Sequence, residues 1–103
     1  MDKIDKLKSF LLMNPQDSFL QHALALEYIK VGEDGEARLL FEAILASDPQ
    51  YIGSYYHLAK LLERTGETDE AIKIYEQGMV ACRIAGDNHA YNELQGAFEN
   101  VAF

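Results

Sequence analysis

The sequence of 103 residues lacks tryptophan and contains only two prolines and one cysteine, Cys82. A single cysteine excludes a disulfide within the chain and a cysteine-based zinc site, so we expect a reducing compartment and a cytoplasmic location. No apolar run approaches the roughly 18–20 residues that a membrane span needs, so we predict no membrane-spanning helix. Asp2 and Asp5 interrupt the apolar N-terminal stretch, which is expected to be a helix and not a signal peptide.

Positive charge is also scarce. The chain has 9 Lys and Arg residues against 17 Asp and Glu residues, which gives a formal net charge of −8. Binding to nucleic acids depends on basic surfaces that displace counterions, so this charge argues against a nucleic-acid partner and against anionic membranes. Lys3, Lys6 and Lys8 lie close together in the sequence, which leaves the remainder of the chain still more acidic.

Motifs for catalysis and metal binding are missing as well. The histidines, His22, His57 and His89, have no pair at the i, i+4 spacing that places two imidazoles on one helix face. The acidic clusters at 33–36 and 67–70 lack the alternating ligands of a calcium loop and match helix N-termini, where carboxylates oppose the helix dipole. Cys82 continues an apolar stripe, so a packed thiol is expected. We predict no metal, no cofactor and no enzyme activity.

The chain does contain an internal repeat. Residues 54–77 have the pattern of a helix, a tight turn at Gly66 and a second helix, and the same pattern occurs 34 residues earlier. The matching residues of the two copies are Leu24, Ala25, Gly32, Glu33, Glu36, Ala37 and Glu42 against Leu58, Ala59, Gly66, Glu67, Glu70, Ala71 and Glu76. A fixed spacing of this kind is typical of stacked helical hairpins.

Apolar residues at helical spacing predict no strand and six helices, at 2–13, 18–31, 35–47, 53–65, 69–85 and 88–101. Pro15 and Pro49 end two of them because proline lacks an amide donor. Arg83 stands where the second repeat would have a proline, so the fifth helix is expected to continue until Gly86 stops it. Gly78 is unfavourable in mid-helix by about 1 kcal/mol, so a close contact is expected there. The predicted buried stripe of the second helix is Leu20, Leu24, Ala25, Tyr28 and Val31.

This pattern resembles the tetratricopeptide repeat family over nearly the whole chain. The family's positions are matched by Leu24, Ala25, Tyr28, Ala37, Phe41 and Pro49 in the first repeat, and by Tyr55, Leu58, Ala59, Ala71, Tyr75 and Gly78 in the second. The departures are Gln21, Ile44, Leu62 and Arg83. The resemblance implies an all-α, right-handed helical-hairpin solenoid that forms a single domain, 1–103. Its parts would be an N-terminal half-repeat helix (1–15), two repeats (18–51 and 52–85) and a capping helix (87–103).

The resemblance further implies a protein–protein interaction module, a scaffold or adaptor, that binds a peptide or protein segment in a concave groove lined by the first helices. Carried over position by position, the groove residues are Phe19, His22, Leu26, Ile29, Lys30, Tyr56, Lys60, Glu63 and Arg64. Some members hold a C-terminal carboxylate with lysine and asparagine, but His22, Leu26 and His57 occupy three of those positions here. Apolar residues beside basic ones suit a peptide with an apolar anchor and a nearby carboxylate, whereas the alternative is a solvated face.

A second hypothesis concerns the N-terminal helix, which has no hairpin partner within the repeat pattern. Its apolar residues Ile4, Leu7, Phe10 and Leu11 cannot all be covered by the next helix alone. Uncovered apolar surface of this kind often marks an interface between subunits. The alternative function is therefore a self-assembling structural unit, such as a homodimer formed through this helix.

Overall fold

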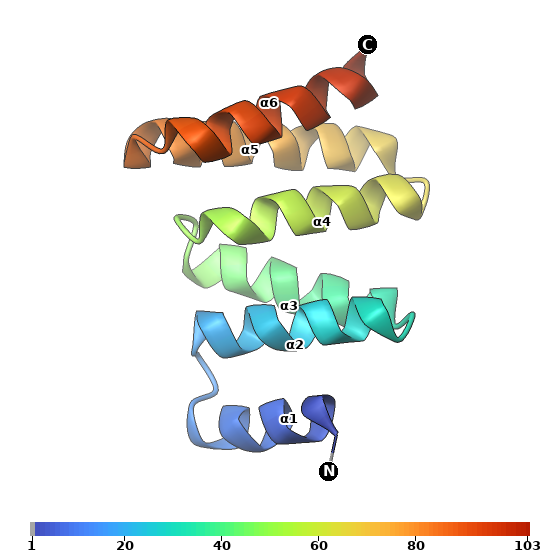
Figure 1. Cartoon of the computed structure of the whole chain (residues 1–103), viewed down its shortest axis with the longest axis vertical. Helices are drawn as coiled ribbons and strands as arrows, with labels where there is room; N and C mark the ends of the chain where they lie inside the picture. The colour runs from blue at the N-terminus through green and yellow to red at the C-terminus, as the bar shows by residue number, and fades with distance from the viewer. Residues whose placement is uncertain (1) are drawn as a thin grey trace. The chain divides into compact units, whose positions relative to one another are not determined.

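A computed structural model of the chain describes residues 2–103, so Met1, the first residue of the predicted segment 1–15, lies outside it. The described residues form six helices and no strand: α1 Lys3–Met13, α2 Ser18–Lys30, α3 Asp34–Ser47, α4 Ile52–Arg64, α5 Thr68–Ala85 and α6 Asn88–Ala102 (Figure 1). The six predicted helices are thus confirmed, with every boundary within one residue. Within 2–103, none of the helices has the length and apolar composition to cross a bilayer.

The helix ends follow from local chemistry. Asp17 begins α2 by accepting a hydrogen bond from the Leu20 amide at 3.0 Å, and Asp87 begins α6 by accepting one from the Ala90 amide at 3.0 Å. Such carboxylate caps satisfy amide groups that have no partner inside the helix. Gly86 ends α5 in the left-handed conformation, with φ of 71°, which favours glycine. The helix stops where the sequence predicted.

The last turn of α5, where the repeat pattern would have ended the helix, contacts α6. Arg83, which replaces the expected proline, donates a hydrogen bond from Nη2 to the Tyr91 hydroxyl at 2.7 Å. Its guanidinium carbon also lies 5.0 Å from the centre of the Tyr91 ring. A proline at this position would lack these interactions and would break the helix. The last turn of α5 is therefore stabilised against α6.

Two compact units make up the described chain, one ending at Asp48 and the other spanning Pro49–Phe103. In the first unit, α2 packs against both α1 and α3. In the second, α5 packs against both α4 and α6, and α4 touches α6 more sparsely. The predicted division of a single domain into the segments 1–15, 18–51, 52–85 and 87–103 stays a prediction.

Small residues allow these helices to approach closely. Ala25, Ala37, Ala59 and Ala71 are all completely buried, as the repeat pattern requires. One part of the predicted stripe of α2 was wrong, because Val31 is 60% exposed. Val31 is the residue that caps α2, where the backbone leaves the helix and carries the side chain away from the buried face.

Gly78 makes the close contact that its mid-helix position predicted. A Cβ atom added at Gly78 would lie 2.8 Å from the Tyr55 Cβ and 3.0 Å from Leu94 Cδ1, which is too close for any residue larger than glycine. In the repeat, Gly78 corresponds to Ile44, and Tyr55 corresponds to Gln21. At these two repeat positions, the second unit therefore has the large Tyr55 with Gly78. The first unit has the smaller Gln21 with Ile44.

Candidate functional site

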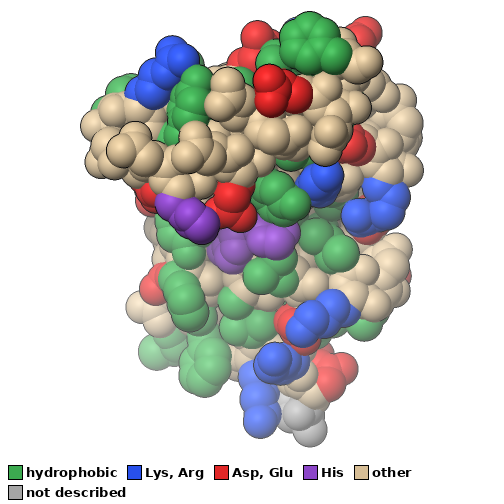
Figure 2. All heavy atoms as spheres, turned by 45° about the horizontal axis from the view of Figure 1, so that its top comes forward, with side chains coloured by type: hydrophobic (Ala, Val, Ile, Leu, Met, Phe, Trp, Pro, Cys, Tyr) green, Lys and Arg blue, Asp and Glu red, His purple; other side chains and the backbone are tan. Residues whose placement is uncertain are grey.

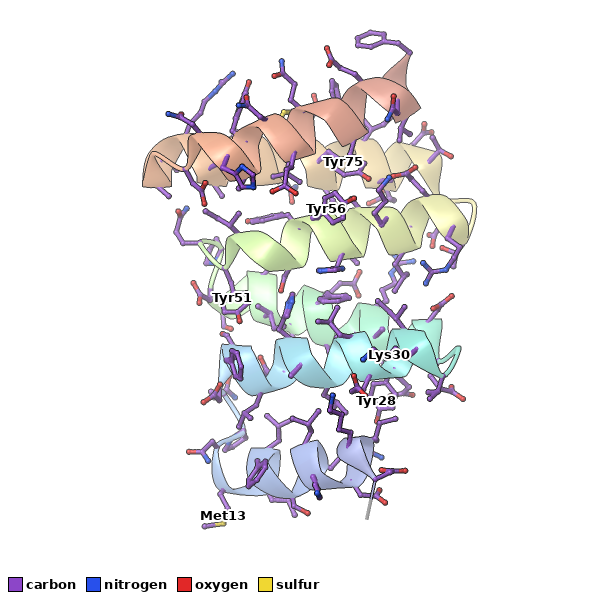
Figure 3. The ribbon with its side chains drawn as sticks, viewed as in Figure 1. Met13, Tyr28, Lys30, Tyr51, Tyr56 and Tyr75 are labelled. Carbon is purple, nitrogen blue, oxygen red and sulfur yellow. The ribbon has the colours of Figure 1, made fainter. Side chains whose placement is uncertain are left out.

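The predicted groove residues of α4 form a connected set. The Lys60 ammonium lies 5.8 Å from the centre of the Tyr56 ring and 3.6 Å from a carboxylate oxygen of Glu63. Glu63 also accepts a hydrogen bond from the Tyr75 hydroxyl of α5. Figure 3 labels Tyr56 and Tyr75 of this set. Tyr56, Lys60 and Glu63 are half-buried, and Arg64 is exposed. These contacts connect Tyr56, Lys60 and Glu63 of α4 with Tyr75 of α5.

Tyr75 is the anchor of this set. Its side chain is completely buried in the core, while its hydroxyl reaches Glu63. Burial, followed by the hydrogen bond to Glu63, raises the pKa of Tyr75 well above its usual value. The hydroxyl therefore stays protonated and remains a donor throughout the physiological range. In the sequence, Tyr75 stood out only as a matched position of the second repeat, although a buried tyrosine hydroxyl generally needs a partner.

A small pocket opens beside Tyr56, between α4 and α6. Its volume is about 200 Å³. The lining from α4 includes Ile52, Tyr56 and His57. The lining from α6 includes Glu93 and Leu94. Burial lowers the pKa of His57, so this imidazole is neutral near pH 7. From the sequence, α6 was expected only to cap the repeats. Its part in this surface depends on how α6 packs beside α4, which the sequence pattern does not show.

The predicted residues of α2 belong to the first unit. Phe19 is 69% exposed, whereas His22, Leu26 and Ile29 are half-buried. The His22 ring meets the buried Phe41 ring edge to face, with centres 5.6 Å apart. Lys30 is exposed and forms an ion pair with Glu27 at 2.9 Å. These five residues lie along one helix, and they are described apart from those of α4 because the two sets belong to different units.

Carboxylates accompany the basic residues of both sets. Glu27 faces Lys30, and Glu63 faces Lys60. The ion pair with Lys30 lowers the pKa of Glu27. Figure 2 shows acidic and basic side chains lying next to one another at several places on the face drawn. An incoming carboxylate would have to compete with Glu27 and Glu63 for these basic side chains.

The predicted oligomer residues of α1 are only partly covered. Ile4, Leu7 and Leu11 are half-buried, and Phe10 is 56% exposed. None of the described residues of α1 is fully buried. Leu12 and Met13, which the prediction omitted, are 84% and 81% exposed. The sequence did contain a signal for them, since they continue the apolar run from Phe10.

Cys82 and His89 lie outside the sets described above. Cys82 is buried, and burial raises the pKa of its thiol, which confirms the prediction of a packed cysteine. His89 is exposed and lies 3.1 Å from Glu93. Over residues 2–103, no group of three or more His, Cys, Asp and Glu side chains could hold a metal ion.

Helical hairpins with small buried residues at fixed positions, carrying an exposed face with aromatic and charged side chains, define a helical-repeat protein of the interaction type. The chain belongs to the tetratricopeptide repeat family, whose family model, described as "Tetratricopeptide repeat", matches residues 28–80.

The chain is similar to several known proteins, of which three are described here. A tetratricopeptide repeat domain protein from Salinibacter ruber, solved in solution, is 42% identical, with a TM-score of 0.81, covering 84% of this chain and 88% of that one. The mouse interferon-induced protein with tetratricopeptide repeats 3 is 30% identical over 71 residues, or 69% of this chain. This chain spans only 18% of that relative's length. The first TPR of Spaghetti (RPAP3), bound to the HSP90 peptide SRMEEVD, shares the fold at a TM-score of 0.74 and 21% identity, covering 97% of this chain and 78% of that one.

Proposed function

We propose that the chain is a protein–protein interaction module that binds a peptide or protein segment through the surface around Tyr56 on α4. The observation that carries this proposal is the pocket between α4 and α6 beside Tyr56. Its volume of about 200 Å³ is below the range of roughly 300–1,000 Å³ typical of small-molecule sites, and suits one apolar or aromatic side chain of a partner. Burying such a side chain contributes about 1.5–3 kcal/mol.

The groups around the pocket support binding rather than catalysis. Tyr56 offers an apolar ring with restricted freedom, and Tyr and Arg are enriched among the residues that dominate binding energy at interfaces. Lys60, beside the Tyr56 ring, and Glu63 balance each other's charge. The bound HSP90 peptide of the Spaghetti domain supports a peptide as the ligand class, although the fold alone is shared with that domain. We also propose a scaffold or adaptor role for the chain, in the cytoplasm.

Affinity capture from the source cell, followed by mass spectrometry, tests the proposal. The partner captured by the unmodified chain is then titrated against the double variant Tyr56→Ala, Lys60→Ala. We expect binding to weaken about 30-fold or more, which corresponds to about 2 kcal/mol, the scale of an interface hot spot. The matched control is Glu36→Gln, Glu70→Gln, which changes exposed residues in the first turns of α3 and α5. Loss of the partner in the control and not in the double variant would mean that the proposal assigns binding to the wrong face.

A second candidate function is self-assembly through α1. The exposed apolar side chains of Phe10, Leu12 and Met13 favour it, because neighbouring apolar groups at a surface often form subunit contacts. Sedimentation at tens of micromolar should then give a dimer that Leu12→Glu, Met13→Glu converts to a monomer. A monomer mass for the unmodified chain at that concentration would eliminate this candidate.

A further inference from the structure

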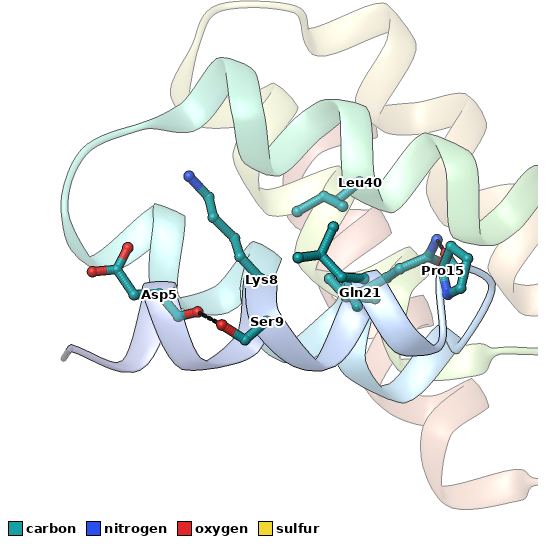
Figure 4. A pocket seen from close by; sticks show the side chains of 8 residues that line it. Asp5, Lys8, Ser9, Pro15, Gln21 and Leu40 are labelled. Carbon is teal, nitrogen blue, oxygen red and sulfur yellow. Dashed lines mark hydrogen bonds between the residues drawn. The ribbon is translucent and has the colours of Figure 1, made fainter.

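The first unit contains a larger pocket that includes none of the predicted groove residues. It has a volume of about 640 Å³ and is formed by α1, the turn at Pro15, α2 and α3 (Figure 4). Leu11 and Leu12 of α1 and Leu40 of α3 supply apolar walls. Lys8 stands on the polar side, with its ammonium 5.8 Å from the centre of the Tyr28 ring. This volume lies within the range of ligand-binding pockets.

Gln21 gives the pocket its chemistry. The side chain lines the pocket, is only 9% exposed, and donates from Nε2 to the Pro15 carbonyl at 3.0 Å. This bond fixes which end of the amide is the nitrogen. The other end, Oε1, is buried and accepts no hydrogen bond from any residue in the described range 2–103. An unpaired buried acceptor costs about 1–3 kcal/mol, so its presence needs a reason.

The second repeat has a different side chain at the same position. Tyr55 corresponds to Gln21, and its hydroxyl donates to the Pro49 carbonyl at 2.7 Å. The tyrosine ring is larger than the glutamine side chain, and it leaves no carbonyl oxygen unpaired. Gln21 keeps the bond to the turn but adds an acceptor. Gln21 is also one of the residues at which the chain departs from the repeat pattern.

We propose that this pocket is a second binding site, which takes an apolar side chain of a partner polypeptide together with an N–H group that donates to Gln21 Oε1. A polypeptide meets both requirements, since it carries amide donors beside apolar side chains. An ionised fatty acid offers apolar length but no donor. Less than 1 Å² of Oε1 is exposed, so the proposal includes a displacement of wall side chains that opens Oε1 to the donor. The site is independent of the proposed surface on α4.

Titration of the ¹⁵N-labelled full chain with a minimal peptide probe tests the proposal. The probe is N-acetyl-leucine N-methylamide, and its matched control is the analogue in which every amide N–H is methylated. We expect saturable shifts of the Gln21 side-chain amide and of the Leu11 and Leu40 backbone amides. The methylated analogue should bind at least about fivefold more weakly, the ratio for one lost hydrogen bond. Equal binding of the two probes, or no saturable shift in the first unit, overturns the proposal.

Variants separate this site from the other features. Gln21→Met keeps the length of the side chain but removes the acceptor, together with the donor to Pro15, so the two probes should then bind with equal affinity. Ser9→Phe places a ring in the pocket from an exposed position of α1 and should remove probe binding. Tyr56→Ala should leave the shifts at Gln21 unchanged. Loss of these shifts in that variant would show that the two sites are not independent. Shifts at Leu11 and Leu12 that appear on concentrating the chain without probe would show a second copy in the pocket, which also overturns the proposal.

Discussion

Tyr55 donates a hydrogen bond from its hydroxyl to the Pro49 carbonyl oxygen at 2.7 Å, across the turn that precedes α4. Gln21 makes the corresponding bond to Pro15 at 3.0 Å ahead of α2. Proline provides no amide hydrogen to the turn, but its carbonyl remains an acceptor. The same repeat position therefore closes the turn in both units, through a phenol in one and a carboxamide in the other.

Tyr55→Phe should destabilise the protein by about 1 kcal/mol, because it removes the donor for a partly buried carbonyl and leaves the ring in place. For a domain of this size, that corresponds to a decrease in Tm of about 4–8 °C. Thermal unfolding followed by circular dichroism measures it. Tyr56→Phe is the matched control, since its ring and its position beside Lys60 are retained, and its Tm should change by much less.

Gly78→Ala should destabilise the protein although alanine is the better helix former by about 1 kcal/mol. The new methyl group would lie 2.8 Å from the Tyr55 Cβ, and such overpacking costs about 1–3 kcal/mol. Gly96→Ala in α6 is the control, because a Cβ at Gly96 meets nothing within 4 Å. Urea unfolding should show lower stability for Gly78→Ala and higher stability for Gly96→Ala. Equal stabilisation by both would mean that the contact with Tyr55 is not restrictive.

Alkaline pH should weaken the protein through Tyr75. Its pKa is raised from the usual value of 10.0, chiefly by burial, so the folded state resists losing the proton that the unfolded state loses. The resulting stability is fully present below pH 10 and is lost as the pH rises above it, by up to about 1.4 kcal/mol per pH unit. Tyr75→Phe, which places in α5 the residue found at position 41, should show a shallower decline between pH 9 and 11. An identical decline would assign the effect to other groups.

The helices were predictable because residues near their ends determine where each helix begins or stops. Pro15, Pro49 and Gly86 act on the backbone directly, so the sequence alone located the boundaries. Burial at individual positions was less accessible. Leu61 is 1% exposed although it is not one of the repeat positions Tyr55, Leu58, Ala59 and Leu62, since helix neighbours on more than one side determine what is covered.

The candidate site was only partly predictable for the same reason. The positions on α2 and α4 follow from the repeat, but the bond from Tyr75 to Glu63 joins residues on two helices. The pocket at Gln21 depends on the volume left between three helices and on the orientation of one amide group. Neither quantity has a periodic signal in the sequence.

The packing of each helix mainly against its neighbours in sequence has a kinetic consequence. Contacts of α2 with α1 and α3, and of α5 with α4 and α6, require the closure of short loops only. Such low contact order is associated with folding in microseconds to milliseconds, because little chain entropy is lost before contacts form. The chain can therefore acquire its native packing soon after each hairpin is synthesised, and partly folded forms with exposed apolar faces should be short-lived.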